Sequence, residues 1–345
     1  MSATAGMNFT SDNCFGASPE ILAALSAANS GAQPSYGDDA ATLRLSERFS
    51  ALFEREVAVF PVISGTAANA LALATLVPSH GAILCHSASH IVTDECGAVE
   101  SFSHGARLVP LEGADGKLEP GAIAAALSRF EKGSVHHLQP LAVSLTNATE
   151  LGTVYRPDEI AAVAERARAE GLKVHMDGAR FANAIAHLGC SPADATWRAG
   201  VDVLSFGATK NGALGAEAVI FFEPALAADF VWRRKKAGHL ISKMRFVSVQ
   251  LEAYLEDDLW LRNATRANAL ARRLAETMPG ELAHPVEANE VFLRLPDALV
   301  ARLRSVGARF YDWTPSENGR TLIRLVTSFA TPENDTEALI ALARG

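Results

Sequence analysis

The sequence predicts an α/β fold: a mostly parallel β-sheet covered by helices, followed by a smaller α+β part at the C-terminus. In the first two-thirds of the chain, helical patterns alternate with short, fully apolar strands. Such strands, when separated by helices, are typical of a parallel sheet that is buried on both faces. From about Phe230 the pattern changes, because long helices come first and several strands follow them.

Each element of the first two-thirds has a local signal. Apolar residues at helical spacing predict helices, Pro or a capping residue marks where they begin, and short β-branched or fully apolar runs predict strands. In order, the expected elements are a helix capped by Asp38-Asp39, a strand at 57–63, a helix from Ser64 to about Val77, a strand at 82–85, a helix from Glu119-Pro120 to near Gly133, a strand at 141–146, a helix from Pro157 to Gly171, and strands at 172–176, 201–206 and 218–222.

The last third has a different pattern of expected helices and strands. A basic stretch, residues 233–236, leads into a long helical region, and after it we expect strands at 290–295, 309–313 and 321–327, a helix at 298–306 and a final helix after Pro332. We therefore expect two domains. Residues 1–250, beginning with an N-terminal arm (1–20), would form the large one, and residues 251–345 the small one.

Composition excludes several classes of protein. The 345 residues carry 31 basic and 39 acidic side chains, for a net charge of −8, which argues against a nucleic-acid binder. No stretch approaches the run of about 18 apolar residues that a membrane span requires. The first residues show no secretory signal, and the four cysteines have no CxxC spacing. We expect a cytoplasmic enzyme with reduced thiols and no membrane partner.

The first candidate for a binding element is the segment Ser64-Gly65-Thr66-Ala67-Ala68-Asn69, which lies between a strand and a helix. Its small residues let the backbone approach an anion closely, and the free N–H groups and dipole of a helix start favour phosphate. An ordinary strand-to-helix turn is the alternative interpretation, because the segment matches neither of the common nucleotide-binding glycine motifs.

Two further strand ends carry ionisable groups, and ligands of open α/β sheets bind beyond such ends. Asp177-Gly178-Ala179-Arg180 places a carboxylate and a guanidinium together, although Asp177 alone would also fit a helix N-cap. Lys210 stands in a loop of small residues between two apolar strands, where it is either a nucleophilic amine or a solvated side chain.

Arg324 lies within an apolar strand and needs a carboxylate partner unless it faces water.

Together and in this order, the four signals (the segment 64–69, the DGAR motif, Lys210 and Arg324) fit one cofactor. Pyridoxal 5'-phosphate needs a phosphate cradle, a carboxylate for its ring nitrogen and a Schiff-base lysine, and its amino-acid substrates need an arginine for the α-carboxylate.

The chain also resembles a known family, the low-specificity L-threonine aldolases of the fold type I pyridoxal-phosphate enzymes, from about Asn8 onward. The motifs that carry the resemblance are Ser11-Asp12, Tyr36-Gly37-Asp38-Asp39, the segment 64–69, His90, Asp177-Gly178-Ala179-Arg180, Lys210, Met244-Arg245 and Arg324-Leu325-Val326-Thr327. The YGDD motif, the DGAR motif and the later lysine, in this order, form a combination that is specific for this family.

The resemblance implies roles for these residues. Lys210 would hold the cofactor, Asp177 would pair with its ring nitrogen, and His90 would stack on the ring. The other implied cofactor contacts are Gly65, Thr66, Ala67, Arg180 and Arg245, and the implied substrate contacts are Ser11, Tyr36, Arg180 and Arg324. The reaction implied is cleavage of a β-hydroxy-α-amino acid, such as L-threonine, L-allo-threonine or phenylserine, to glycine and an aldehyde, in a homodimer or homotetramer.

One departure from the family pattern concerns the base. Many members carry a second histidine in a motif like ENTHNGG, whereas residues 146–152 here read TNATELG. The β-hydroxyl would lose its proton to His90, to a water or to Glu150, and we favour His90 because its usual pKa is near neutrality.

Other functions remain as alternatives. Another enzyme of the same cofactor class, such as a β-eliminating lyase, aminotransferase or racemase, would give different products. A non-catalytic or nucleotide-binding α/β protein would stay colourless with the cofactor. We expect no metal, because the histidine pair at 86 and 90 lacks the glutamate of the zinc-protease motif.

Overall fold

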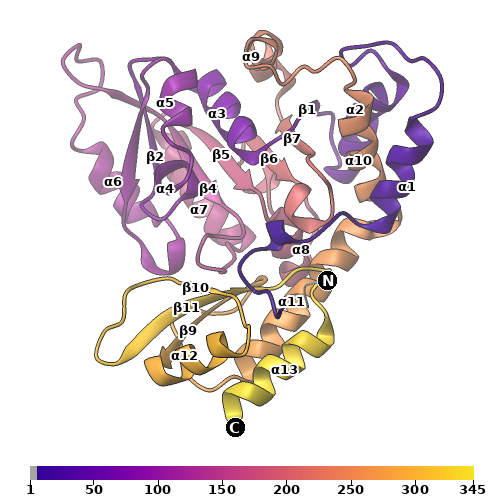
Figure 1. Cartoon of the computed structure of the whole chain (residues 1–345). Coiled ribbons are helices and arrows are strands. Elements are labelled where there is room, and N and C mark those ends of the chain that lie inside the picture. The colour runs from indigo at the N-terminus through magenta and orange to yellow at the C-terminus, as the bar shows by residue number, and fades with distance from the viewer. Residues whose placement is uncertain (1–5) are drawn as a thin grey trace.

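The computed structural model describes residues 6–345, so the first five residues of the expected N-terminal arm lie outside the described part. The chain forms a seven-stranded sheet with helices on both faces and a separate four-stranded sheet, drawn at the bottom of Figure 1. Among the described residues, no helix combines the length and apolar character needed to cross a bilayer.

The elements follow one another in the order that the sequence predicts, with additions. The strands are β1 (Ala58–Val62), β2 (Gly81–His86), β3 (Arg107–Leu111), β4 (Gln139–Thr146), β5 (Lys173–Gly178), β6 (Val203–Gly207), β7 (Glu217–Phe221), β8 (Glu281–Leu282), β9 (Glu290–Pro296), β10 (Tyr311–Asp312) and β11 (Arg320–Val326). The helices are α1 (Pro19–Ala28), α2 (Ala40–Leu52), α3 (Gly65–Leu76), α4 (His90–Thr93), α5 (Ala98–Phe102), α6 (Pro120–Leu127), α7 (Pro157–Ala169), α8 (Phe181–Leu188), α9 (Phe230–Lys236), α10 (Arg245–Leu255), α11 (Leu259–Thr277), α12 (Asp297–Ser305) and α13 (Glu333–Arg344).

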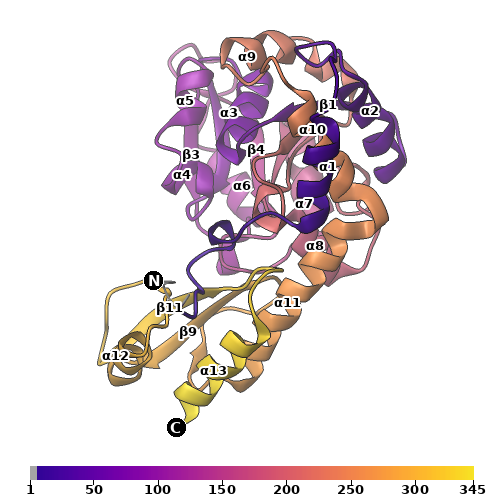
Figure 2. The same cartoon turned by 45° about the vertical axis from the view of Figure 1, so that its right-hand side comes forward.

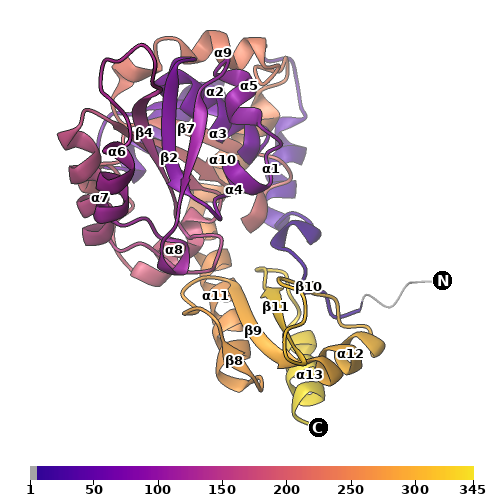
Figure 3. The same ribbon diagram turned by 90° about the vertical axis from the view of Figure 1, so that its left-hand side faces the viewer.

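The large sheet has the strand order β1-β7-β6-β5-β4-β2-β3. Its strands pair in parallel except at β7, which runs antiparallel to both of its neighbours. In Figure 3, α6 and α7 lie on one side of this sheet and α3 and α5 on the other. The predicted fold class is therefore confirmed.

Both faces of the large sheet are covered by apolar side chains. On one face, Phe49 of α2, Phe206 of β6 and Trp260 of α11 belong to the largest buried cluster. On the other face, α3 packs Leu71 against Val203 of β6. Strand β1 runs parallel to β6, because both are antiparallel to β7, and α3 begins directly after β1. The start of α3 therefore lies at the carboxyl end of the central strands.

Helix α11 connects the two sheets, as Figure 2 shows. Its first half joins the large buried cluster, whereas Ala271 and Leu274 join the cluster of the C-terminal sheet. The N-terminal segment reaches the same small sheet, because the N–H of Phe9 donates to Arg309 O and its carbonyl accepts from Val326 N. The two apolar clusters support a boundary between two domains, and its position near residue 250 stays a prediction.

The structure differs locally from these expectations. The helix expected to end near Gly133 ends at Leu127. Strand β3 was not expected, because it is an edge strand with an exposed Arg107 and an internal proline, which only an edge tolerates. Helix α8 was not expected either, since it begins directly after the DGAR motif.

Candidate active site

One cavity of about 360 Å³ lies at the carboxyl ends of the central parallel strands. This volume is within the usual range of small-molecule sites. The cavity lining includes six of the predicted site residues: Gly65, Thr66, His90, Asp177, Arg180 and Lys210. Parallel strands bring their carboxyl ends to one edge, and that geometry brings together residues far apart in the sequence.

The start of α3 forms the wall expected for a phosphate. Ser64 is the N-cap, and its Oγ accepts the N–H of Ala67 at 3.3 Å. The cap leaves the N–H groups of Gly65 and Thr66 without an intrahelical acceptor, because the first turn of a helix cannot supply one. A Cβ built on Gly65 would meet no atom within 4 Å, so the backbone is open to the cavity at this point. Of the three residues predicted here, Ala67 has its N–H already engaged.

Of the six predicted residues that line the cavity, Asp177 is the one that belongs to a strand. It lies within β5 and is 4% exposed. Its carboxylate accepts from Ala179 N–H through Oδ1 at 2.9 Å and from Asn69 Nδ2 through Oδ2 at 2.8 Å. The N-cap position of α8 is Arg180, so the alternative of a helix cap does not hold for Asp177. The fixed carboxylate is suited to hold a protonated ring nitrogen.

Lys210 lies in a short turn of 3-10 helix, Thr209–Asn211, between β6 and β7. Among residues 6–345, its amine has no hydrogen-bond or ion-pair partner. Nearby, Glu217 accepts the N–H of Ala208 at 3.0 Å, and burial raises the pKa of this carboxyl to about 7. A lysine without a partner at the cavity wall is free to react with a carbonyl carbon.

His90 is held by a chain of hydrogen bonds that ends at Asp177. The Nδ1 of His90 lies 2.9 Å from Glu95 Oε1, and Asn69 Nδ2 donates to that same oxygen at 2.9 Å. This contact with Glu95 raises the pKa of His90, while burial raises the pKa of Glu95. With Nδ1 on the carboxylate, Nε2 is the ring nitrogen left for a ligand.

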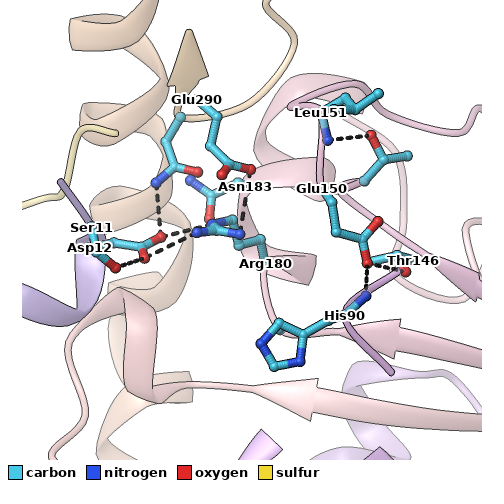
Figure 4. A network of polar contacts seen from close by, with 12 residues as sticks. Ser11, Asp12, His90, Thr146, Glu150, Leu151, Arg180, Asn183 and Glu290 are labelled. Carbon is cyan, nitrogen blue, oxygen red and sulfur yellow. Dashed lines mark hydrogen bonds and ion pairs between the residues drawn. The ribbon is translucent and has the colours of Figure 1, made fainter. Parts of the chain in front are cut away.

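Glu150 lies beside the backbone of His90, as Figure 4 shows. Its Oε1 accepts the His90 N–H at 2.8 Å and the Thr146 hydroxyl at 2.9 Å. Its Oε2 is buried and has no partner within the described part of the chain. Burial, followed by the nearby Asp177, raises the pKa of Glu150 to about 7. The side chain lines the cavity in the segment that lacks the family's second histidine.

Arg180 lines the cavity but is already paired. Its Nε and Nη2 donate to the two oxygens of Asp12 at 2.8 and 3.1 Å (Figure 4). Ser11, the neighbour of Asp12, accepts the N–H of Asn13 and is not part of the cavity lining, although Asn13 is. The hydroxyl of Ser11 donates to Asp12 Oδ1 at 3.4 Å, so the predicted serine and arginine both contact Asp12.

Arg324 lies in β11 of the second sheet, and it is not among the residues that line the cavity. Its guanidinium lies 5.5 Å from the ring of Tyr311 and 5.1 Å from that of Trp313. Its Nη1 is 3.8 Å from Glu290. The alternative of a water-facing arginine does not hold, because only 19% of its side chain is exposed.

Tyr36 and Arg245 lie outside the cavity of the single chain. Tyr36 has a φ of 59°, is about half exposed, and stacks under Lys235 at 4.1 Å. Arg245 is the first residue of α10, and its Nη1 donates to Gly31 O at 3.4 Å.

Sequence reasoning missed several residues of the site. Asn69 and Asp12 were within recognised motifs but had no assigned role, whereas Glu95, Glu217 and Glu290 had no sequence signal. Each is an acidic or amide side chain whose importance depends on a contact across the fold. No cluster of three or more potential metal ligands occurs in residues 6–345.

A lysine, a buried carboxylate and an open helix start around one cavity, on this strand order, define the class of fold type I pyridoxal-phosphate enzymes. Comparison with known proteins places the chain more narrowly. The family model of the beta-eliminating lyases matches residues 8–298. The low specificity L-threonine aldolase of Pseudomonas aeruginosa is 48% identical over 97% of this chain and 96% of its own length, and that of a Pseudomonas sp. is 47% identical over 90% and 91%.

Solved structures agree with this placement. A threonine aldolase from Leishmania major superposes with a TM-score of 0.92 at 28% identity, covering 98% of both chains. The Escherichia coli aminotransferase YbdL, at 14% identity and a TM-score of 0.73 over 98% and 93% of the two chains, shares the fold alone. The chain belongs to the beta-eliminating lyase family, among its low-specificity L-threonine aldolases, a family that depends on pyridoxal phosphate.

Proposed function

We propose that this protein cleaves the Cα–Cβ bond of L-threonine, L-allo-threonine and related β-hydroxy-α-amino acids, such as phenylserine, to give glycine and an aldehyde. The observation that carries the proposal is the meeting of Lys210, Asp177 and the start of α3 in one cavity, in a chain nearly half identical to aldolases of this kind. Pyridoxal 5'-phosphate is the proposed cofactor.

The residues of the cavity fit this cofactor. Lys210 would hold it, the carboxylate of Asp177 would keep its ring nitrogen protonated, and the N–H groups of Gly65 and Thr66 would bind its phosphate. The unpartnered amine and the open start of α3 support these assignments. When bound, the cofactor supplies an electron sink for the bond that breaks. The protein's part is to orient the substrate so that this bond, and no other, is the one activated.

His90 is the proposed base for the β-hydroxyl proton. Its Nδ1 is directed to Glu95, so Nε2 is free to accept a proton from a ligand in the cavity. Glu150 is the competing base, since its Oε2 has no partner among residues 6–345 and its pKa is close to neutral. His90→Asn should depress turnover far more than it weakens cofactor binding, and Glu150→Gln should do much less. The reverse outcome would assign the base role to Glu150.

A homodimer or homotetramer is proposed as well. Tyr36 and Arg245 belong to motifs shared with the family but lie outside the cavity of their own chain, so we propose that they contribute to the site of a neighbouring subunit. Light scattering after gel filtration measures the subunit number. A monomer with full activity would contradict this part of the proposal.

The decisive test is the reaction itself. Purified protein supplied with pyridoxal phosphate should become yellow, and with L-allo-threonine it should release glycine and acetaldehyde. Borohydride reduction followed by peptide mapping should place the pyridoxyl group on Lys210. A keto acid or an inverted amino acid as the product would indicate an aminotransferase or a racemase, and a colourless protein would refute the cofactor.

A further inference from the structure

A glutamate lies between the two arginines to which the substrate carboxylate is assigned. Glu290, the first residue of β9, is 1% exposed. Its Oε2 is 3.3 Å from Nη1 of Arg180, and its Oε1 is 3.8 Å from Nη1 of Arg324. Figure 4 shows its carboxylate directed toward Arg180. Neither oxygen has a hydrogen bond of good geometry within residues 6–345.

The opposite edge of Arg180 is occupied by Asp12, which also accepts from Asn289 Nδ2 at 3.0 Å. Two guanidinium groups thus face two carboxylates, and the charges of this buried cluster balance. An added substrate carboxylate would leave an excess negative charge away from water, which is costly. Either the carboxylate binds poorly or one of the resident acids becomes neutral.

We propose that Glu290 neutralises Arg180 and Arg324 in the free protein and takes up one proton from solvent when the substrate's α-carboxylate binds to these arginines. This inference rests on the proposed function, because it concerns the substrate of the same site. The charge balance is kept: both arginines stay positive, Asp12 and the substrate stay negative, and Glu290 becomes neutral. Its new O–H can donate to the incoming carboxylate.

Hydrogen bonding indicates that the proton goes to Glu290 and not to Asp12. Asp12 accepts two bonds from Arg180 and one from Asn289, and such bonds favour the ionised form. Within the described residues 6–345, Glu290 has only the two longer ion pairs. Burial raises the pKa of Glu290, whereas the pKa of Asp12 is lowered in spite of burial, because Arg180 and its hydrogen bonds stabilise the ionised form. The charged groups that act on Glu290 are Arg180, Arg324, Asp12 and Lys210.

Two consequences follow for recognition. Carboxylate binding becomes linked to pH, since a proton enters with the ligand, and affinity should fall as pH rises by up to about tenfold per pH unit. An amine without a carboxylate would face a site whose arginines are already neutralised, and so it would cause no proton uptake. Glu290 would therefore act as a specificity residue for amino acids.

The test uses the holoprotein and 3-hydroxybutyrate, a β-hydroxy acid that has the carboxylate but no amine. Isothermal titration in two buffers of different ionisation enthalpy counts the protons taken up on binding. We expect uptake approaching one proton per bound ligand, with affinity that falls as pH rises. In Glu290→Gln we expect no uptake and a flat affinity. Glu287→Gln is the matched control and should keep both effects, because Glu287 contacts Val154 N–H instead.

The wild-type proton count tests the inference even if Glu290→Gln does not fold. Binding without proton uptake, or the same uptake in Glu290→Gln, would overturn it, and so would failure of 3-hydroxybutyrate to bind at all. The proposed function is judged separately by the cleavage of L-allo-threonine. A protein that cleaves this substrate but takes up no proton would lose only the role of Glu290.

Discussion

Glu95→Gln should lower the pKa of His90 without moving its ring. The glutamine has the same shape, and its Oε1 can still accept from His90 Nδ1 and from Asn69 Nδ2, the two contacts that Glu95 makes at 2.9 Å. What the substitution removes is the negative charge. The contact with Glu95 is the largest cause of the raised pKa of His90, so its loss should bring the value back toward the usual one.

The size of the effect follows from the kind of bond that is lost. A hydrogen bond between charged groups contributes about 1.5–3 kcal/mol, against about 1 kcal/mol for a neutral one. The difference of about 1 kcal/mol is reduced by solvent, because 39% of the His90 side chain is exposed. We therefore expect the pKa of His90 to fall by somewhat less than about one unit, since one unit corresponds to 1.36 kcal/mol.

NMR titration of the histidine C2 resonances measures this shift, with His90→Asn assigning the signal. Glu150→Gln is the control, because Glu150 contacts the backbone N–H of His90 and not its ring. If the proposed base role holds, the acidic limb of the cleavage rate should move to lower pH by the same amount. An unchanged His90 pKa in Glu95→Gln would refute this reasoning about the hydrogen-bond chain.

Three other predictions concern the cavity and the sheet. Asp177→Asn should fold normally and lose at least about 10²-fold in kcat, since an amide cannot keep a ring nitrogen protonated; near-normal turnover would contradict its role. Arg324→Lys should raise KM for amino acids and leave cofactor affinity unchanged, because a lysine cannot make a bidentate contact; loss of cofactor would place the arginine at the phosphate. His175, buried between Ser144 and Ser205, has its pKa lowered to about 4 by burial, so only the unfolded chain takes up a proton below its usual pKa of 6.5. Its contribution to the free energy of unfolding should thus fall by up to about 3 kcal/mol between pH 6.5 and 4, and urea titrations of wild type and His175→Gln at both pH values would show whether the loss belongs to this residue.

The sequence by itself determined the order of elements and the residues at the strand ends. Apolar runs predicted the central strands, and Ser64 and Pro157 marked helix starts that the structure confirms. Such signals are local, because periodicity and capping depend on neighbours within one or two turns. Asp177 and Lys210 could be placed together from the sequence, since parallel strands always bring their carboxyl ends to one edge.

Only the tertiary structure decided which partners these residues meet. Glu95 reaches His90 through a short helical turn, and Glu290 enters between Arg180 and Arg324 from the second sheet. No periodic pattern encodes such contacts, because an isolated glutamate on a strand or a loop looks the same whether it faces water or a guanidinium. Its ionisation and its role depend on the burial and the charges that distant segments bring to it, and those exist only once the chain has folded.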